Sequence, residues 1–288
     1  LNEVRDQRTD LSFIALDVPT GVDAQTGEID NKCNAADMTL TFGAPKVGLF
    51  KFPAASQVGH LEVIDIGLPP HIDRDIRLEL ADDQMVKRAL PSRALDSHKG
   101  SFGHVVVVGG STRFVGAPIL ACKAAYRSGA GLITLAAPLS VYKLAATQIT
   151  EAIHQPIEET ETGQASHKAA PSIVQALTDA DSAVIGPGLG QSESIHEFIK
   201  QILLVKGPAN CPLVIDADAI NVLANTPQWW DRLNFPSILT PHPAEMSRLL
   251  KENIVVVQQD RVGIAQRAAE KWGKCCCTQR CSYGNCRT

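Results

Sequence analysis

The stretch from residue 97 to residue 138 constrains the fold of this chain more than any other. Its apolar, β-branched run at 105–108 is too short for a helix and ends at two glycines, which predicts a buried strand. An Ala-rich helical segment follows and stops at Gly129, and residues 132–136 predict a second strand that ends at Pro138. Strand, glycine-rich turn, helix and strand make a right-handed βαβ unit, which predicts a parallel sheet with helices on its faces.

Composition limits the class of protein. The 288 residues are 44% hydrophobic, enough to bury a sizeable core and to predict more than one domain. The net charge of -4 argues against a nucleic-acid or anionic-membrane partner. No apolar run approaches the roughly 18 residues of a membrane span, and the first residues lack the pattern of a signal peptide. The chain does not begin with Met, so a preceding targeting signal stays open, and the default prediction is a cytoplasmic protein.

Cysteine usage is uneven along the chain. Cys33, Cys122 and Cys211 are scattered, as reduced thiols in a cytosolic enzyme would be. The other five cysteines fall at 275–288, where their spacing matches a zinc site only loosely. We therefore interpret residues 275–288 as a Cys-rich tail that does not belong to the fold, in preference to a metal site.

The N-terminal part of the chain predicts three short strands with little helix between them, at 13–16, 38–42 and 60–66. Asp17 follows the first of these strands at the start of a turn, the position where open parallel sheets place ligands. The competing interpretation is that Asp17 only accepts hydrogen bonds from nearby turn amides.

Residues 1–70 resemble the C-terminal half of the NAD(P)H-hydrate epimerase domain in three segments, ALDVPTGVDAQTG, ADMTLTFGAPKVGL and VIDIGLP. That domain has a Rossmann-like fold and interconverts the C6 epimers of hydrated NAD(P)H. The resemblance implies that Asp17 contacts the substrate and that Thr20 helps to hold a potassium ion, with a Thr hydroxyl in place of the family's Ser. The front half of the domain, with its Asn-Asn-Gly-Gly-Asp loop, has no counterpart here, so we expect no epimerase activity from this chain alone.

Between this region and the βαβ unit, residues 71–96 are charged and interrupted by proline, which predicts a linker with at most one strand that docks on the next domain. Beyond the βαβ unit, Ser140 is expected to cap a helix. The polar stretch 153–166 is interpreted as loop, and a helix is expected at 171–178.

Four turns in residues 97–274 each follow a separate apolar strand. They contain Gly109, Gly188 within the segment GPGLG, Asp216, and His242. Because the carboxyl ends of parallel strands share one edge of a sheet, these turns should meet at that edge. His242 lies between two prolines, so it belongs to neither a helix interior nor a strand ladder, and its side chain can pair with anionic groups.

Each of these positions also has a purely structural interpretation. The segment around Gly188 is compatible with a tight turn, and Asp216 and Asp218 are compatible with N-capping of the next helix, an interpretation that we favour for Asp218. Glu245 fits the first turn of the helix after His242, where its charge suits the helix dipole. The turn at Gly109 lacks both the G-x-G-x-x-G spacing of a nicotinamide dehydrogenase and the G-K-S/T of a P-loop.

Residues 80–274 resemble the ADP-dependent NAD(P)H-hydrate dehydratase family, which has a ribokinase-like fold with a central, mostly parallel sheet. Besides the βαβ stretch, the segments AVIGPGLG, LVIDADAINVL and ILTPHPAEMSRLL carry the resemblance. It maps the hydrate-binding positions onto Ala117, Gly188 and His242. It also implies NADHX or NADPHX as substrate, ADP as phosphoryl donor and Mg²⁺, and it allows a homo-oligomer.

The two resemblances together match the arrangement of bifunctional hydrate-repair enzymes. The fold class that they predict is α/β. A partial Rossmann-like domain (1–70) and a linker (71–96) precede an incomplete ribokinase-like domain (97–274) with a central, mostly parallel sheet.

After Lys274, CCCTQRCSYGNCRT stands where the dehydratase family has an apolar strand, a K-G-x-x-T nucleotide loop and a G-x-G-D motif. The Asp of that last motif is the family's expected base, so we assign no catalytic residue and expect impaired activity. The helix that ends near Lys274 is expected to expose apolar surface. Two other functions stay open: a ribokinase-like kinase acting on a small alcohol, and a noncatalytic nucleotide-binding or scaffolding protein.

Overall fold

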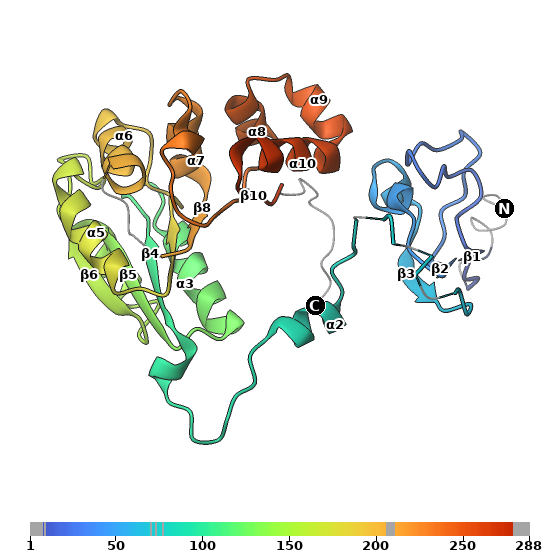
Figure 1. Cartoon of the computed structure of the whole chain (residues 1–288), viewed down its shortest axis with the longest axis horizontal. Coiled ribbons are helices and arrows are strands. Elements are labelled where there is room, and N and C mark those ends of the chain that lie inside the picture. The colour runs from blue at the N-terminus through green and yellow to red at the C-terminus, as the bar shows by residue number, and fades with distance from the viewer. Residues whose placement is uncertain are drawn as a thin grey trace. The chain divides into compact units, whose positions relative to one another are not determined.

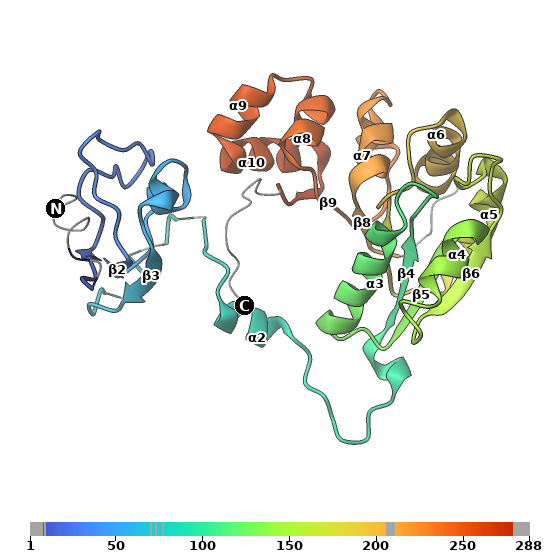
Figure 2. The ribbon, with the colours of Figure 1, turned by 180° about the vertical axis from the view of Figure 1, so that it is seen from behind.

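The computed structural model describes residues 8, 10–69, 71–72, 74–76, 78–205 and 211–278. The chain forms two compact units, Leu1–Ser92 and Arg93–Thr288, each with its own sheet. Figure 1 labels the elements along the chain, and Figure 2 shows the same ribbon from behind. Within the part of the chain that the structure describes, no helix is both long and apolar enough to cross a membrane.

The first unit is built on a three-stranded parallel sheet in the order β1-β2-β3. The strands are β1 (Ile14–Leu16), β2 (Met38–Phe42) and β3 (His60–Ile64), close to the predicted runs. The buried hydroxyl of Thr39 donates a hydrogen bond to the Val58 carbonyl (2.7 Å) and so fixes the loop before β3. The connection from β2 to β3 carries two 3₁₀ turns, η1 (Val47–Phe50) and η2 (Ala54–Ser56).

A helix, α2 (Asp83–Ala89), occupies the segment that was expected to hold at most a strand. Asp82 caps it by accepting a hydrogen bond from the Met85 amide (2.7 Å). Acidic Asp83 in its first turn and two basic residues in its last turn complement the helix dipole. Every residue of α2 is exposed, so local capping and charge favour the helix without support from a core. The predicted docking strand is therefore wrong.

The second unit contains a seven-stranded sheet in the order β10-β9-β8-β7-β4-β5-β6, in which every neighbouring pair is parallel. All the carboxyl ends therefore lie at one edge, and the predicted α/β class with a parallel sheet is confirmed. The strands are β4 (His104–Val108), β5 (Leu132–Pro138), β6 (Ile153–Ile157), β7 (Ser182–Ile185), β8 (Leu213–Ile215), β9 (Ser237–Leu239) and β10 (Cys275–Cys276).

Helices cover both faces of this sheet (Figures 1 and 2). Val107 faces a core cluster with α3 (Gly116–Ser128) and α4 (Leu139–Ala145), whereas Val106 and Val108 face the larger cluster on the other side. This alternation is what an extended strand requires. The larger cluster draws on α5 (Ala170–Thr178), α6 (Glu193–Lys200), the π-helix η5 (Gln201–Val205), α7 (Ala217–Ala224), α8 (Pro243–Leu250), α9 (Ile254–Gln259) and α10 (Arg261–Trp272). Single 3₁₀ turns are η3 (Lys99–Phe102), η4 (His167–Ala169) and η6 (Trp229–Asp231).

Two local predictions in this unit are wrong. Residues 153–157, expected to be loop, form the edge strand β6, and a strand that pairs only with β5 tolerates Pro156 and polar side chains. Ser140 does not cap α4. Its amide and hydroxyl both donate to Glu159 Oε2 (2.9 and 2.7 Å), and these hydrogen bonds hold the pKa of Glu159 below its usual range.

The sheet continues into the segment that was expected to lie outside the fold. Cys275 and Cys276 form β10, and the Cys277 amide donates to the Leu239 carbonyl (2.8 Å). Pairing at a sheet edge requires only backbone groups, so a cysteine-rich composition does not prevent it. Residues 279–288, the rest of the predicted tail, lie outside the described residues.

Apolar surface is exposed on the helix that ends near Lys274, as expected, at Val262 of α10 (42%), although Trp272 at the end of the same helix is buried. Apolar surface is also exposed on β9. Val107, Val184, Val214 and Ile238 pair in one row across the sheet, and exposure rises from 0% at Val107 to 42% at Ile238.

Among the described cysteines, Cys122 and Cys211 are buried, whereas Cys275 and Cys277 are exposed. Burial raises the pKa of Cys122 to about 12 and that of Cys211 to about 11. Because the thiolate is the reactive form, we expect iodoacetamide to modify exposed Cys275 and Cys277 in the native protein and Cys122 and Cys211 only after unfolding. Peptide mass spectrometry after timed alkylation measures this. Equal rates for Cys122 and Cys277 in the native state would contradict it.

Candidate functional site

A glycine-rich loop follows β7 and contacts both neighbouring strand ends. Gly186 has φ 125° and Gly188 has φ 73°, a region that other residues adopt only with strain. A methyl group on Gly186 would overlap the Asp216 carbonyl oxygen of the turn after β8. On the other side, Gly110 N–H donates to the Pro187 carbonyl (2.9 Å). The loop therefore joins the turns that follow β4 and β8.

Ala117 and Gly188, two of the predicted hydrate-binding residues, are brought together. Ala117 lies in the first turn of α3, and a methyl group built on Gly188 would sit 3.3 Å from the Ala117 Cβ and 2.8 Å from the Phe114 Cβ. The Ser111 hydroxyl donates to the Gly188 carbonyl (2.8 Å) and fixes the loop against the turn after β4. Only a residue without a side chain fits position 188.

The two aspartates after β8 have different roles from those expected. Asp216 occupies the N-cap position of α7, but its side chain accepts a hydrogen bond from the Thr240 hydroxyl (2.7 Å) and makes no capping bond. Asp218, for which we favoured capping, accepts from the Gly190 amide (2.7 Å) and from Gln191 Nε2 (2.6 Å). The capping interpretation is wrong for Asp218, because α7 starts two residues earlier than such a cap would require, at Ala217, and directs this side chain at the glycine-rich loop.

His242 lies at the same sheet edge, two residues after Thr240, as the N-cap of α8. Its Nδ1 accepts hydrogen bonds from the amides of Ala244 (3.1 Å) and Glu245 (3.4 Å). An accepting Nδ1 places the proton of the neutral ring on Nε2, which is 3.2 Å from Glu245 Oε1. The side chain is 40% exposed, so part of this fixed imidazole is accessible to a ligand.

Glu245 does more than complement the dipole of α8. It is a buried carboxylate that accepts from the His242 amide (2.9 Å), which completes a reciprocal capping box. Burial raises the pKa of this carboxyl, and the Asp216 charge adds to the increase, while the His242 amide and ring oppose it. The interaction with Asp216 couples the turn after β8 to the start of α8.

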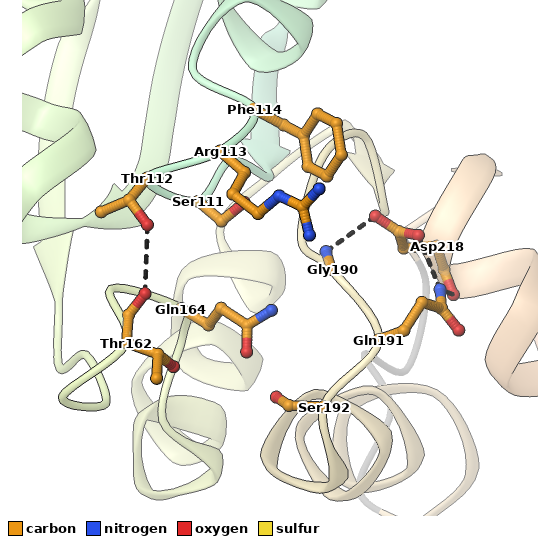
Figure 3. Close-up of a pocket in the computed structure, with 10 residues that line it drawn as sticks. All are labelled: Ser111, Thr112, Arg113, Phe114, Thr162, Gln164, Gly190, Gln191, Ser192 and Asp218. Atoms are coloured by element: carbon orange, nitrogen blue, oxygen red, sulfur yellow. Dashed lines mark hydrogen bonds between the residues drawn. The ribbon is translucent and has the colours of Figure 1, made fainter.

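A pocket of about 490 Å³ opens beside the glycine-rich loop (Figure 3). It is lined by Ser111, Thr112, Arg113, Phe114, Thr162, Gln164, Gly190, Gln191, Ser192 and Asp218. These residues come from the loops after β4, β6 and β7 and from the start of α7. Sequence reasoning did not identify Arg113 or Gln164, because neither belongs to a recognisable motif and the Gln164 loop was not expected to follow a strand.

The first unit carries a second polar cluster, around Asp17. Asp17 follows β1 with φ 66°, and its Oδ1 accepts hydrogen bonds from the Phe42 amide (3.0 Å), from the Thr41 hydroxyl (3.4 Å) and from Lys46 Nζ. The Lys46 ammonium and the Phe42 amide hold the pKa of Asp17 below its usual range. The interpretation of Asp17 as a partner of nearby turn amides is wrong, because its donors lie on and after β2.

Thr20, the predicted potassium ligand, is exposed and its hydroxyl makes no hydrogen bond to another described residue. A Thr hydroxyl and turn carbonyls are oxygen donors of the kind that hard cations bind, so the residue type fits the ion. Across the described residues, no group of three or more His, Cys, Asp and Glu side chains is placed to hold a metal ion.

Comparison with known families finds two matches in chain order. The pattern described as YjeF-related protein N-terminus matches residues 2–48, and the pattern described as NAD(P)H-hydrate dehydratase matches residues 105–278.

Curated relatives match along most of the chain. The bifunctional NAD(P)H-hydrate repair enzyme Nnr of Moorella thermoacetica is 38% identical over 261 residues, which cover 90% of this chain and 49% of that protein. The Nnr of Salinibacter ruber is 36% identical over 270 residues, covering 91% of this chain and 49% of that protein. The chain thus spans about half the length of these relatives.

Solved structures match the second unit's architecture. A ribokinase-like superfamily protein from Enterococcus faecalis aligns with a TM-score of 0.58 and 25% identity, over 69% of this chain and 65% of that one. An ADP/ATP-dependent NAD(P)H-hydrate dehydratase from Bacillus subtilis, co-crystallised with ATP/Mg²⁺, aligns with a TM-score of 0.57 and 27% identity, over 71% of this chain and 68% of that one.

Proposed function

Because the chain belongs to the NAD(P)H-hydrate dehydratase family, we propose that its second unit binds hydrated NAD(P)H and serves the ADP-dependent restoration of NAD(P)H. The binding edge contains Ala117, Gly188 and His242. The observation that carries the proposal is the packing of the first turn of α3 against the glycine-rich loop. A built methyl on Gly188 lies only 3.3 Å from the Ala117 Cβ, so the two segments that carry these positions are in contact at this edge of the sheet.

The proposed reaction replaces a poor leaving group by a good one. The C6 hydroxyl of the hydrate loses its proton to solvent as its oxygen attacks the terminal phosphorus of ADP, and AMP leaves. The C6–O bond then breaks to release phosphate, and C5 loses a proton to solvent, which forms the C5=C6 bond of NAD(P)H. Such a transfer depends on positioning and charge stabilisation more than on covalent help from the protein. His242 suits the positioning role because its ring is fixed through Nδ1 and faces the edge of the sheet. Mg²⁺ bound to the nucleotide would offset phosphate charge during the transfer.

For the first unit we propose a remnant of the hydrate-epimerase site. Asp17 supports this because Lys46, Thr41 and Phe42 all donate to Oδ1, whereas Oδ2 makes no hydrogen bond to a described residue. An acceptor fixed in this way suits contact with a substrate hydroxyl or amide. Thr20, three residues on, would contribute its hydroxyl oxygen to a potassium ion.

The proposal predicts selective stabilisation of the protein by the hydrate. A ligand at 100 times its Kd stabilises a protein by about 2.7 kcal/mol, which corresponds to roughly 5–10 °C in Tm for a unit of this size. We expect a shift of this order with NADPHX, and no comparable shift with NADPH or with a panel of sugars, in a thermal-unfolding assay.

His242→Ala should remove most of that shift, because the side chain forms part of the binding edge. His60→Ala is the matched control, since His60 is an exposed histidine on β3 of the other unit. An undiminished shift in His242→Ala would remove this residue from the site. A shift with a sugar but not with the hydrate would favour the kinase interpretation.

A further inference from the structure

We propose that Arg113 and Gln164 form a phosphate-binding subsite in the pocket beside the glycine-rich loop. The identity of the ligand that carries the phosphate rests on the proposed function, but the anion chemistry of the subsite does not. The proposal follows from three features of the pocket, namely its cation, its amide and its carboxylate.

The cation is Arg113, whose guanidinium is not neutralised. Among the described residues it makes no hydrogen bond or ion pair, and its guanidinium carbon lies 5.7 Å from the centroid of the Phe114 ring. Figure 3 shows the guanidinium directed over the pocket rather than away from it. Its five N–H donors form a planar fork that matches phosphate oxygens.

The amide is that of Gln164, whose half-buried side chain packs against the glycine-rich loop but makes no hydrogen bond to a described residue. A methyl group on Gly190 would overlap Gln164 Nε2, so this side chain packs directly on the glycine-rich loop. Neither atom of the amide makes a hydrogen bond within the described part of the chain, whereas its backbone is paired with Thr160. In Figure 3 the amide extends into the same space as the Arg113 guanidinium. Both atoms of this amide are therefore available to a ligand in the pocket.

The carboxylate is Asp218, the single acidic residue that lines the pocket. Its Oδ2 accepts from the Gly190 amide (2.7 Å) and its Oδ1 from Gln191 Nε2 (2.6 Å). Both carboxylate oxygens of Asp218 thus accept hydrogen bonds from the glycine-rich loop. These hydrogen bonds limit the repulsion between Asp218 and an anionic ligand in the pocket. Among the described residues that line it, the pocket therefore presents the Arg113 cation and the Gln164 amide donor to a ligand.

A pocket of about 490 Å³ accommodates part of a nucleotide. Two phosphate positions of the hydrates are compatible with the subsite. Both hydrates carry a pyrophosphate bridge, and NADPHX carries in addition a phosphate on the 2′ position of a ribose.

Inorganic pyrophosphate is the direct probe, measured by calorimetry against the full chain at two salt concentrations. We expect Arg113→Gln to weaken its binding roughly ten- to a hundredfold, the range of a hydrogen bond to a charged group. Gln164→Met, which keeps the side chain's length, should weaken it less. Arg127→Gln is the matched control, because Arg127 is an exposed arginine in the last turn of α3.

Equal affinities for the wild type, Arg113→Gln and Arg127→Gln would overturn the proposal, as would undetectable binding of pyrophosphate by the wild type. Circular dichroism establishes that each variant is folded. If Arg113→Gln weakens NADHX and NADPHX alike, the subsite holds the pyrophosphate bridge, and if it weakens only NADPHX, it holds the 2′-phosphate. If pyrophosphate binding depends on Arg113 and neither hydrate binds, the subsite stands and the proposed function fails.

Discussion

Gly186→Ala is expected to lower the free energy of unfolding of the second unit by about 2–5 kcal/mol. Strain at φ 125° accounts for about 1–3 kcal/mol of this loss. Steric overlap with the Asp216 carbonyl oxygen and a 2.8 Å approach to the Ala219 Cβ add a comparable overpacking cost. Both neighbours belong to the β8–α7 junction, which is anchored to the sheet and has little freedom to move. Urea unfolding followed by circular dichroism measures the loss.

Alanine substitutions at two other glycines of the same unit separate the cost of backbone strain from the cost of steric overlap. Gly273 has φ 61° and open space around it, so Gly273→Ala should cost only about 1 kcal/mol. Gly116 has open space and no positive φ, so Gly116→Ala should change stability by less than about 1 kcal/mol, in either direction. If Gly186→Ala costs no more than Gly273→Ala, the close approach of the two loops is not a constraint on the fold.

Glu245→Gln is expected to remove a pH dependence from stability. Because burial raises the pKa of Glu245, the folded state binds this proton more tightly than the unfolded state does. The contribution of Glu245 to stability therefore falls as pH rises above its ordinary pKa of 4.5 and through its folded value. The difference in unfolding free energy, wild type minus Glu245→Gln, should decline over that range by about 1.4 kcal/mol for each unit by which the pKa is raised.

Glu193→Gln is the matched control for this experiment, because Glu193 is an exposed glutamate in the first turn of α6. Because this substitution leaves Glu245 in place, the stability of Glu193→Gln should keep the pH dependence that Glu245 gives the wild type. NMR of the His242 ring nitrogens adds a local measurement, since Glu245→Gln replaces the carboxylate that lies 3.2 Å from Nε2. A difference curve that rises with pH would mean that the His242 charge, and not burial, dominates at Glu245.

The fold of the second unit was predictable because its strongest signals are local. The valine run of β4 and the glycine that ends α3 each specify their element within a few residues, and a βαβ unit has one favoured hand. The apolar runs at β7, β8 and β9 predicted three more strands, but not the strand order, in which β7 pairs with β4 rather than with β6. The predictions that failed concern strands that form by backbone pairing with a neighbour although their own residues are not typical of strands. The polar β6 and the cysteine-rich β10 are both edge strands, and their backbone groups pair with a neighbour that the local sequence does not reveal.

The candidate site was predictable in position but not in chemistry. That Gly188 and Asp216 follow parallel strands is enough to place them at one edge. Which donor each carboxylate takes is a tertiary property, as the hydrogen bonds of Asp218 to the glycine-rich loop and of Asp17 to β2 illustrate. Arg113 and Gln164 are separated by 50 residues of sequence, and only the return of the chain through β6 brings their loops to one pocket.

The short strand β10 has a practical consequence for labelling. Cys277 follows it directly and donates its amide to Leu239, the last residue of β9, from which the chain runs on to His242. The exposed Cys277 thiol therefore belongs to the carboxyl edge of the sheet. With Cys275, Cys281 and Cys286 replaced by serine, a fluorophore on Cys277 would report from that edge without altering a side chain assigned to ligand contact.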